Sequence, residues 1–268
     1  MNFNFKLKIV ILGLKKTKRI LVSFYRIIFA SFINSIDCNG VVKSDRAKVL
    51  YIPIAKNGCS SIKKLIYEYE SRKSIGSDHE LHKIVNSNES IFSESLTVEH
   101  QGYQKLFVCR NPFLRTISFY RNKFEEYNKP RGSGRPEFAY SEYLNGVFRS
   151  SMKFEEVVDV LSQIPDSLSE RHFQSQSFGF DYYLKKNDND ITIIALEDRD
   201  KLNEFCRGYF GKLMYTTNST STDDGEIDLI KKYYTIETLN NIYERYKSDV
   251  NRFGYKSDYD RYKEVLVR

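Results

Sequence analysis

The stretch KLFVCRNPFLRTISFYRNKF, residues 105–124, carries the clearest information about the fold. Its first part, Lys105–Arg110, is an apolar run between charged residues and predicts a buried β-strand. Asn111 can cap a following helix, and Pro112 suits the first helical position, where a missing N–H group costs little. The apolar residues of that helix recur at intervals of three or four and are expected to face the sheet: Phe113, Ile117, Tyr120 and Phe124.

Two more strands are predicted, and each of them also leads into a helix. Ala47–Ile54 and Asp190–Glu197 are short runs that contain β-branched residues. Helical spacing follows over Ile62–Tyr69 and over about Asp198–Tyr209, and a long polar helix is predicted near Ile227–Phe253. Strands that alternate with helices favour an α/β fold, with a parallel sheet and helices on both of its faces.

The composition is that of an ordinary globular protein with a basic balance. Apolar residues make up 41% and charged residues 29% of the 268 residues, which excludes a disordered chain. The net charge of +7 favours partners that carry phosphate, or an anionic membrane surface. The four cysteines form no CxxC pair, so we expect no zinc site, no disulfide framework and a reduced, cytoplasmic protein.

Residues 1–46 differ from the remainder and are predicted to precede a single domain at 47–268. A basic stretch leads into an apolar run at Ile20–Ile36, which Arg26 interrupts. The run is shorter than the roughly 20 apolar residues that span a bilayer, so no transmembrane helix is expected. An amphipathic helix that binds an anionic membrane surface through residues 6–36 and a helix packed on the domain both fit this pattern.

A phosphate-binding turn is predicted between the first strand and its helix, in IPIAKNGCSSIKKL, residues 52–65. The first turn of a helix offers backbone N–H groups without intrahelical acceptors, and the helix dipole adds a positive potential behind them. Lys56 contributes a full charge, and Gly58 lets the backbone approach a ligand closely. The candidate binding residues are Lys56, Asn57, Gly58, Cys59, Ser60 and Ser61. The single glycine differs from the loop of nucleoside triphosphatases, and a purely structural serine cap also fits.

A second phosphate site is predicted at the end of the Lys105–Arg110 strand. Open α/β sheets bind ligands beyond the carboxyl ends of their strands, where Arg110 lies. Ser118 is on the following helix, on a face different from the apolar one, and a guanidinium beside a hydroxyl suits one phosphate group. A salt-bridged surface helix fits this pair equally well, but two such sites in one sheet strengthen each other.

Together these two segments resemble those of a sulfotransferase. IPIAKNGCSS, residues 52–61, resembles the loop that holds the 5′-phosphosulfate of 3′-phosphoadenosine 5′-phosphosulfate (PAPS). Residues 107–124 resemble the 3′-phosphate motif of carbohydrate sulfotransferases of the chondroitin type. ERHFQSQSF at 170–178, IIALED at 193–198 and RYKSDVNRFGY at 245–255 match later parts of that family. The resemblance implies a P-loop-like three-layer α/β fold, with a central parallel sheet flanked by helices.

Departures from the family pattern suggest a bacterial or otherwise divergent member that acts on a different glycan. Ala55 stands where the family usually has proline, and Asn111 stands where an acidic residue is frequent. Neither departure removes a phosphate-binding group.

The implied reaction transfers the sulfuryl group of PAPS to a hydroxyl of a carbohydrate acceptor, without a metal. Lys56 would neutralise charge on the bridging and leaving oxygens, the loop N–H groups would hold the 5′-phosphate, and Arg110 with Ser118 would recognise the 3′-phosphate. A general base should accept the proton of the acceptor. His82 matches the family position best, His100 is second, and His172 matches a position that could be structural.

Two other functions remain open from the sequence. A P-loop kinase-like phosphotransferase would share the phosphate-binding turns but needs ATP and Mg²⁺, and the Walker spacing is missing. A non-catalytic basic protein that binds phosphate or membranes would explain the charge but not two matched sites. No nucleic-acid partner is expected. Arg131 and Arg135, in the predicted loop at residues 128–137, could cover an anionic sugar.

Overall fold

A computed structural model of the chain describes residues 40–76, 80–81, 84, 91–93, 101–130, 137–183, 191–214 and 225–268. The described residues divide into two compact units. The first, here called the sheet unit, comprises Asp37–Asn111 and Ser175–Ser221. The second, the helical unit, includes Pro112–Gln174 and Thr222–Arg268.

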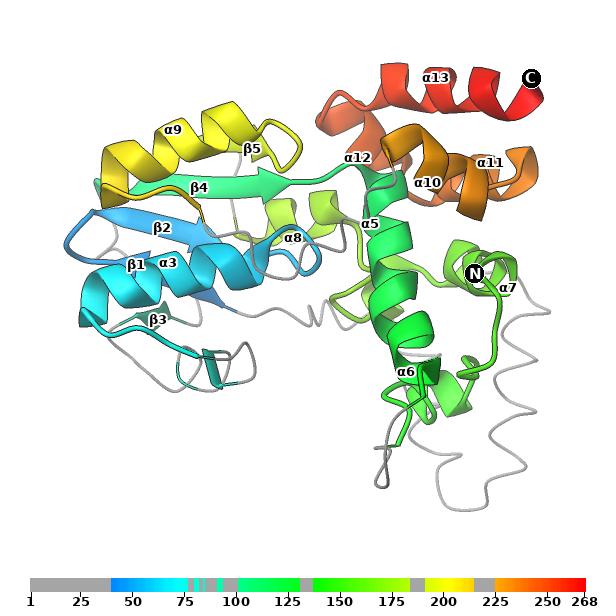
Figure 1. The fold of residues 1–268 in the computed structure, drawn as a ribbon, viewed down its shortest axis with the longest axis horizontal. Helices are drawn as coiled ribbons and strands as arrows, with labels where there is room; N and C mark the ends of the chain where they lie inside the picture. The colour runs from blue at the N-terminus through cyan, green and yellow to red at the C-terminus, as the bar shows by residue number, and fades with distance from the viewer. Residues whose placement is uncertain are drawn as a thin grey trace. The chain divides into compact units, whose positions relative to one another are not determined.

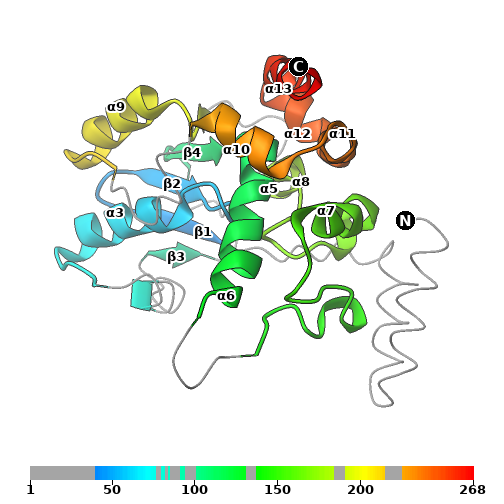
Figure 2. The ribbon, with the colours of Figure 1, turned by 45° about the vertical axis from the view of Figure 1, so that its right-hand side comes forward.

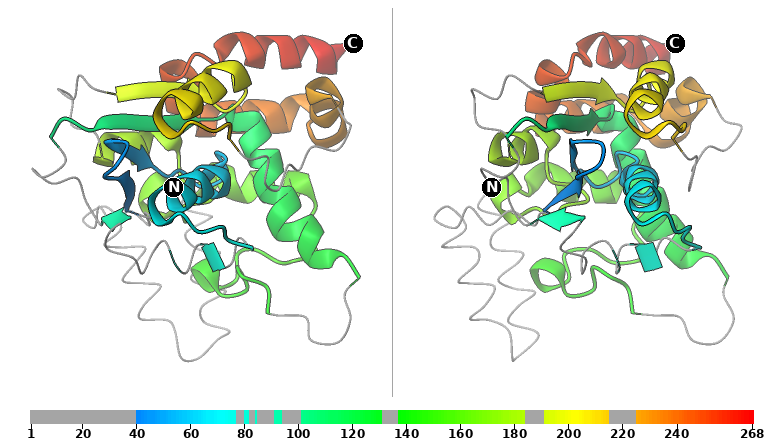
Figure 3. Two further views of the ribbon diagram at one scale, coloured as in Figure 1. Left: turned by 60° about the vertical axis from the view of Figure 1, so that its left-hand side comes forward. Right: turned by 90° about the vertical axis from the view of Figure 1, so that its left-hand side faces the viewer.

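The strands of the sheet unit form one five-stranded sheet in the order β3-β1-β2-β4-β5 (Figure 1). Their bounds are β1 Val41–Ser44, β2 Val49–Ile52, β3 Phe92–Ser93, β4 Gln104–Cys109 and β5 Ile191–Ala195. β2, β4 and β5 are parallel, with Tyr51 opposite Leu106 and Phe107 opposite Ile193 (Figure 3). These are the three strands that the sequence predicts.

The sheet is mixed rather than wholly parallel, because β1 is antiparallel to both β2 and β3. Neither added strand is predicted from the sequence. β1 also precedes residue 47, where the domain was expected to begin, so the sheet extends further toward the amino terminus. A short loop joins β1 to β2, and such a loop permits only an antiparallel pair.

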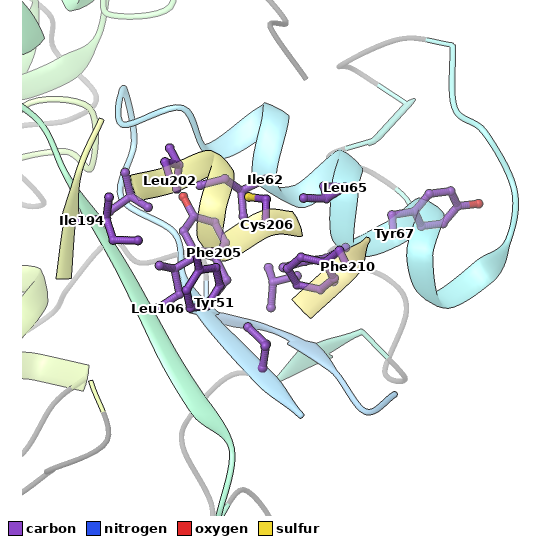
Figure 4. Close-up of a cluster of buried hydrophobic side chains, with 14 of the residues drawn as sticks. Tyr51, Ile62, Leu65, Tyr67, Leu106, Ile194, Leu202, Phe205, Cys206 and Phe210 are labelled. Atoms are coloured by element: carbon purple, nitrogen blue, oxygen red, sulfur yellow. The ribbon is translucent and has the colours of Figure 1, made fainter. Parts of the chain in front are cut away.

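Helices cover both faces of this sheet. On one face, α3 (Cys59–Ser71) and α9 (Arg199–Phe210) pack their apolar sides against β2 and β4. Figure 4 shows this cluster, to which all four elements contribute buried side chains, among them Tyr51, Leu65, Leu106, Phe205 and Phe210. On the other face, the Phe180 ring of α8 (Gln176–Tyr183) meets the Phe107 ring edge-on at 5.0 Å. Alternation along β4 explains why Leu106 and Phe107 point to opposite faces.

The helical unit is built around α5 (Pro112–Tyr120), which begins at the predicted proline. α5 continues through a π-helical turn, Arg121–Glu125, into α6 (Glu126–Asn128) (Figure 2). The remaining helices are α7 Phe154–Gln163, α10 Glu226–Tyr233, α11 Ile236–Arg245, α12 Lys247–Arg252 and α13 Lys256–Val267, with short 3₁₀ turns at Tyr143–Asn145 and Asp166–Leu168.

In the predicted apolar stripe Phe113, Ile117 and Phe124 are buried and Tyr120 is half-buried, and the described ring contacts of the stripe lie within the helical unit. The Phe113 ring contacts Tyr234, Tyr259 and Tyr262 of the carboxyl-terminal region. Phe124, in the π-helical turn, packs on Phe138 and other aromatic rings. The stripe therefore organises an aromatic core of its own, which the sequence does not predict.

The single long helix predicted over Ile227–Phe253 is wrong. Tyr234 has an extended backbone, and Thr235 starts a new helix with its side chain accepting the Thr238 N–H. This pair forms a capping box, which favours a helix start at that position. A second break at Tyr246 separates α11 from α12, so the predicted helix is three helices.

Among the described residues, no helix is long and apolar enough to cross a membrane. The predicted membrane-surface segment at residues 6–36 lies outside the described residues, as do Arg131 and Arg135 of the basic loop.

Candidate active site

The carboxyl ends of the three parallel strands meet at one edge of the sheet, called here the rim. Lys56 follows β2, Arg110 follows β4 directly, and Glu197 follows β5. The rim lies entirely within the sheet unit. This is the edge at which open α/β sheets bind ligands.

The turn between β2 and α3 has an unusual backbone. Lys56 and Gly58 both have left-handed conformations, with φ of +71° and +73°. The Asn57 N–H donates to the Ile54 carbonyl at 3.2 Å, which closes the turn. Glycine adopts this conformation without strain, but lysine does not, so the fold holds Lys56 in a conformation that costs free energy.

Gly58 caps α3 without a side chain, and α3 has no side-chain cap hydrogen bond among the described residues. The Gly58 carbonyl accepts the Ile62 N–H at 3.3 Å, which starts the helical pattern. The first turn of a helix offers N–H groups to a ligand, and the first turn of α3 follows β2 at the rim. A Cβ atom on Gly58 would lie 2.8 Å from Leu196 Cδ1, so the Leu196 side chain would have to shift to make room for it.

Arg110 joins the two predicted phosphate sites. Its Nη1 donates to the Lys56 carbonyl oxygen at 2.8 Å. The guanidinium therefore lies against the β2–α3 turn, and both cationic residues border the same part of the rim. The chemistry of this edge, with a guanidinium, an ammonium and the positive end of a helix, suits an anion with more than one charged group.

Gln176, the first residue of α8, connects both turns from a fully buried position. Its Oε1 accepts the Arg110 N–H at 2.8 Å, and its Nε2 donates to the Arg110 carbonyl at 2.8 Å. Asn57 Nδ2 also donates to Gln176 Oε1, at 2.6 Å, and to the Val108 carbonyl at 2.8 Å. The side chains of Gln176 and Asn57 thus tie the β2–α3 turn to the end of β4.

Glu197 supports the same region from the end of β5. Its Oε1 accepts the Asn111 N–H at 3.0 Å, next to Arg110 in the chain. The neighbouring Leu196 N–H donates to the Cys109 carbonyl at 2.7 Å. The backbone on each side of Arg110 is therefore held by hydrogen bonds.

Ser118 belongs to the other unit, where it is a buried residue of α5. Its pairing with Arg110 at a phosphate group stays a prediction.

His82 and His100, the two preferred candidates for the base, lie outside the described residues. His172, the third, lies in the helical unit beside a half-buried carboxylate. Its Nδ1 is 2.6 Å from Glu170 Oε1, and the Tyr140 hydroxyl donates to Glu170 Oε2 at 3.0 Å. A Nδ1–H group that donates to Glu170 leaves Nε2 as the basic nitrogen.

The protonation of this pair is set by burial and by mutual attraction. Burial lowers the pKa of His172 below its ordinary value, against the opposing hydrogen bond and charge of Glu170. Burial alone would raise the pKa of Glu170, but the hydrogen bonds and charge of His172 and the Tyr140 hydroxyl lower it. Glu170 is therefore ionised at neutral pH, while His172 is mostly neutral.

The described cysteines, Cys59, Cys109 and Cys206, are free thiols, and burial raises the pKa of Cys206 to about 11. In the part of the chain that the structure describes, no three His, Cys, Asp or Glu residues gather as metal ligands. The absence of a metal from the reaction stays a prediction.

Comparison with known families supplies the decisive observation. The model of a family described as "Sulfotransferase family" matches residues 39–256, which is most of the chain. The protein belongs to the sulfotransferase family. Searches among curated proteins and among solved structures returned no match.

The family match covers the described residues of the rim and most of both units of this sulfotransferase. It supports an enzyme that transfers a sulfuryl group, and sulfotransferases of this kind generally take it from PAPS. The groups at the rim fit such a donor, because PAPS carries a 3′-phosphate and a 5′-phosphosulfate, and the rim presents cations and N–H donors beside both turns.

The sequence predicts Lys56, Arg110 and the N–H groups of the first helical turn as site residues, but it indicates no structural role for Gln176 and Asn57. The ERHFQSQSF stretch contains Gln176 and was assigned to the family pattern only. A polar residue at a helix start gives no signal, in one sequence, that it will be buried between two loops.

Proposed function

We propose that this sulfotransferase moves the sulfuryl group of PAPS to a hydroxyl of a carbohydrate acceptor. The observation that carries the proposal is the bond from the Arg110 guanidinium to the Lys56 carbonyl, which joins the two anion-binding turns at one rim. One donor molecule with phosphate at both ends of its ribose can bridge such a pair. A P-loop-like three-layer arrangement of the sheet unit is part of this proposal.

The proposed transfer is an in-line displacement at sulfur. A bond forms between the acceptor oxygen and sulfur, the bond from sulfur to the bridging phosphate oxygen breaks, and adenosine 3′,5′-bisphosphate leaves. Lys56 stabilises the negative charge that develops on the bridging and leaving oxygens, and the N–H groups at the start of α3 hold the 5′-phosphate. Arg110 and Ser118 bind the 3′-phosphate.

The acceptor proton must pass to a general base. His82 and His100 remain the first and second candidates from the sequence. The Glu170 carboxylate gives His172 an orienting partner, as a histidine base requires, so His172 belongs in the same comparison.

A carbohydrate acceptor is favoured by the resemblance of residues 107–124 to the chondroitin-type enzymes. The net charge of +7 supports an acceptor or a membrane surface that is anionic. Binding of the enzyme to anionic lipid through residues 6–36 is the membrane part of the proposal.

Transfer of labelled sulfate from PAPS to a panel of capsular, lipopolysaccharide and glycosaminoglycan-like acceptors tests the function. We expect label on at least one glycan, and loss of that transfer in Arg110→Ala. Label transfer from ATP with Mg²⁺, without transfer from PAPS, would contradict the proposal and favour a kinase. Binding of acidic glycans without any transfer would favour a non-catalytic protein.

A further inference from the structure

Gln176 makes hydrogen bonds at the rim, although the proposed chemistry assigns it no role. It is wholly buried, and its amide makes three hydrogen bonds of 2.6–2.8 Å to the two turns. None of these bonds stabilises α8 itself, since the partners are Arg110 and Asn57.

The hydrogen-bond partners fix the orientation of both amides. The Arg110 N–H can only donate and its carbonyl can only accept, so Gln176 Oε1 must face the first and Nε2 the second. Asn57 Nδ2 then faces Gln176 Oε1 and the Val108 carbonyl. The Asn57 Oδ1 atom is buried and has no hydrogen-bond partner among the described residues. Asn57 therefore holds the turn through its Nδ2 donor, while its acceptor atom is left unsatisfied.

The way in which α8 approaches the rim supports this role. Gly179, in the first turn of α8, lies so close to Ile54 that an added Cβ atom would be 2.9 Å from Ile54 Cδ1. Ile54 is the residue whose carbonyl closes the β2–α3 turn. The Phe180 ring contacts Phe107 of β4 on the same side of the sheet. The helix is therefore anchored to both strands that carry the turns.

From this arrangement we infer that Gln176 is a positioning residue that sets the spacing between the two anion-binding turns. It binds the N–H and the carbonyl of Arg110, which belong to the two peptide groups flanking its Cα, and links them to Asn57, so the guanidinium and the start of α3 keep one separation. This inference rests on the proposed function and deepens it. The separation between the Arg110 guanidinium and the start of α3 would suit a nucleotide with phosphate at both the 3′ and 5′ positions. Gln176 itself need not touch the donor.

The matched control is Gln174. It is the same residue type two positions earlier, it is also buried, and its Nε2 donates to the Asp166 carbonyl at 3.1 Å within the helical unit. Gln174→Met and Gln176→Met therefore remove a buried amide from the same segment, but only the second removes bonds to the rim.

The experiment measures calorimetric affinity for adenosine 3′,5′-bisphosphate in the full-length wild type and in both variants. We expect Gln176→Met to weaken binding about tenfold or more, as loss of buried hydrogen bonds to a ligand-holding loop does, and Gln174→Met to change it less than about twofold. In an Arg110→Ala background the same Gln176→Met change should have little further effect, because the residues act together. A merely structural role would not give this non-additivity.

Gln176→Glu is the second variant if Gln176→Met does not fold. It keeps the acceptor for Arg110 and Asn57 but loses the donor to the Arg110 carbonyl, and we expect a smaller loss of affinity in the same direction. Unchanged affinity in a folded Gln176 variant, an equal loss in Gln174→Met, or full additivity with Arg110→Ala would overturn the inference alone. Wild-type protein that does not bind the bisphosphate would overturn the proposed function, and this inference with it.

Discussion

Lys56 combines a proposed chemical role with a strained backbone, and substitutions at this position can separate the two effects. Its φ of +71° costs a non-glycine residue about 1–2 kcal/mol, which glycine in the same position would not pay. The bond from Arg110 to the Lys56 carbonyl helps to hold this conformation. The ammonium, on the other hand, carries the proposed chemical role.

We therefore predict that Lys56→Ala and Lys56→Gly both lose sulfuryl transfer, while Lys56→Gly is the more stable of the two by about 1 kcal/mol. Initial rates with labelled PAPS and urea unfolding of the same preparations measure the two effects. Transfer retained by either variant would remove Lys56 from the mechanism. Equal stability of the two would show that the left-handed backbone is not strained.

The lowered pKa values of His172 and Glu170 predict how the stability of the folded protein changes in acid. The pKa of His172 is lowered in the folded protein, so below the ordinary histidine value of about 6.5 the unfolded chain binds more protons than the folded one. Folding stability is then lost as the pH falls through that range. The lowered pKa of Glu170 has the same sign at a lower pH. Tyr140, Lys123 and Arg171 are the other groups that act on the pair.

In His172→Gln, the free energy of unfolding should fall less between pH 7 and pH 5 than in the wild type. The difference in slope cannot exceed about 1.4 kcal/mol per pH unit, the value for one proton. Tyr140→Phe is the control, because it removes a hydroxyl bonded to Glu170 without removing the histidine. Denaturant titrations at several pH values give the slopes, and identical slopes in wild type and His172→Gln would contradict the assignment.

Among the elements, the start of α3 depends most on a single residue type. Gly58 has a left-handed backbone and no space for a Cβ atom beside Leu196. The neighbour is the end of a flexible side chain, so it can yield in part, but the backbone strain remains.

Gly58→Ala should therefore destabilise the protein by about 1–3 kcal/mol, and it should weaken binding of a 5′-phosphate more than binding of a 3′-phosphate. Thermal unfolding and calorimetry with adenosine 5′- and 3′-monophosphate provide the test. Gly211→Ala is a suitable control, since Gly211 is also left-handed, at φ of +66°, but has open space around it and caps α9 at its carboxyl end. Equal losses of 5′-phosphate affinity in both variants would contradict the account of the turn.

For the molecule as a whole, the sequence predicts the parts that depend on local pattern. The three parallel strands lie in largely apolar runs, and the segments that follow two of them carry Lys56 and Arg110, which the structure brings to one rim. β3 has only two residues, and the four residues of β1 include Lys43 and Ser44, so neither gives the apolar run that the equally short β2 gives. Both form because neighbouring strands pair with them. The network around Gln176 depends on residues far apart in the chain, which no local pattern contains.

The carboxyl-terminal region is a second place where the local sequence pattern does not predict the structure. A polar, helix-favouring composition predicted one helix over Ile227–Phe253, but the Thr235–Thr238 capping box and the break at Tyr246 divide it. At the first break, the Tyr234 hydroxyl donates to the Phe113 carbonyl at 2.9 Å, and the Tyr234 ring packs against the Phe113 ring. Packing within the helical unit therefore overrides local propensity.

The central claim is that two anion-binding turns hold the two ends of one nucleotide. Calorimetry with adenosine 3′,5′-bisphosphate and with the 3′- and 5′-monophosphates tests it most directly, using wild type and Arg110→Ala. The account predicts that the wild type binds the bisphosphate more tightly than either monophosphate, and that Arg110→Ala binds it no better than the 5′-monophosphate. Equal wild-type affinity for all three ligands, or an unchanged preference in Arg110→Ala, would contradict it.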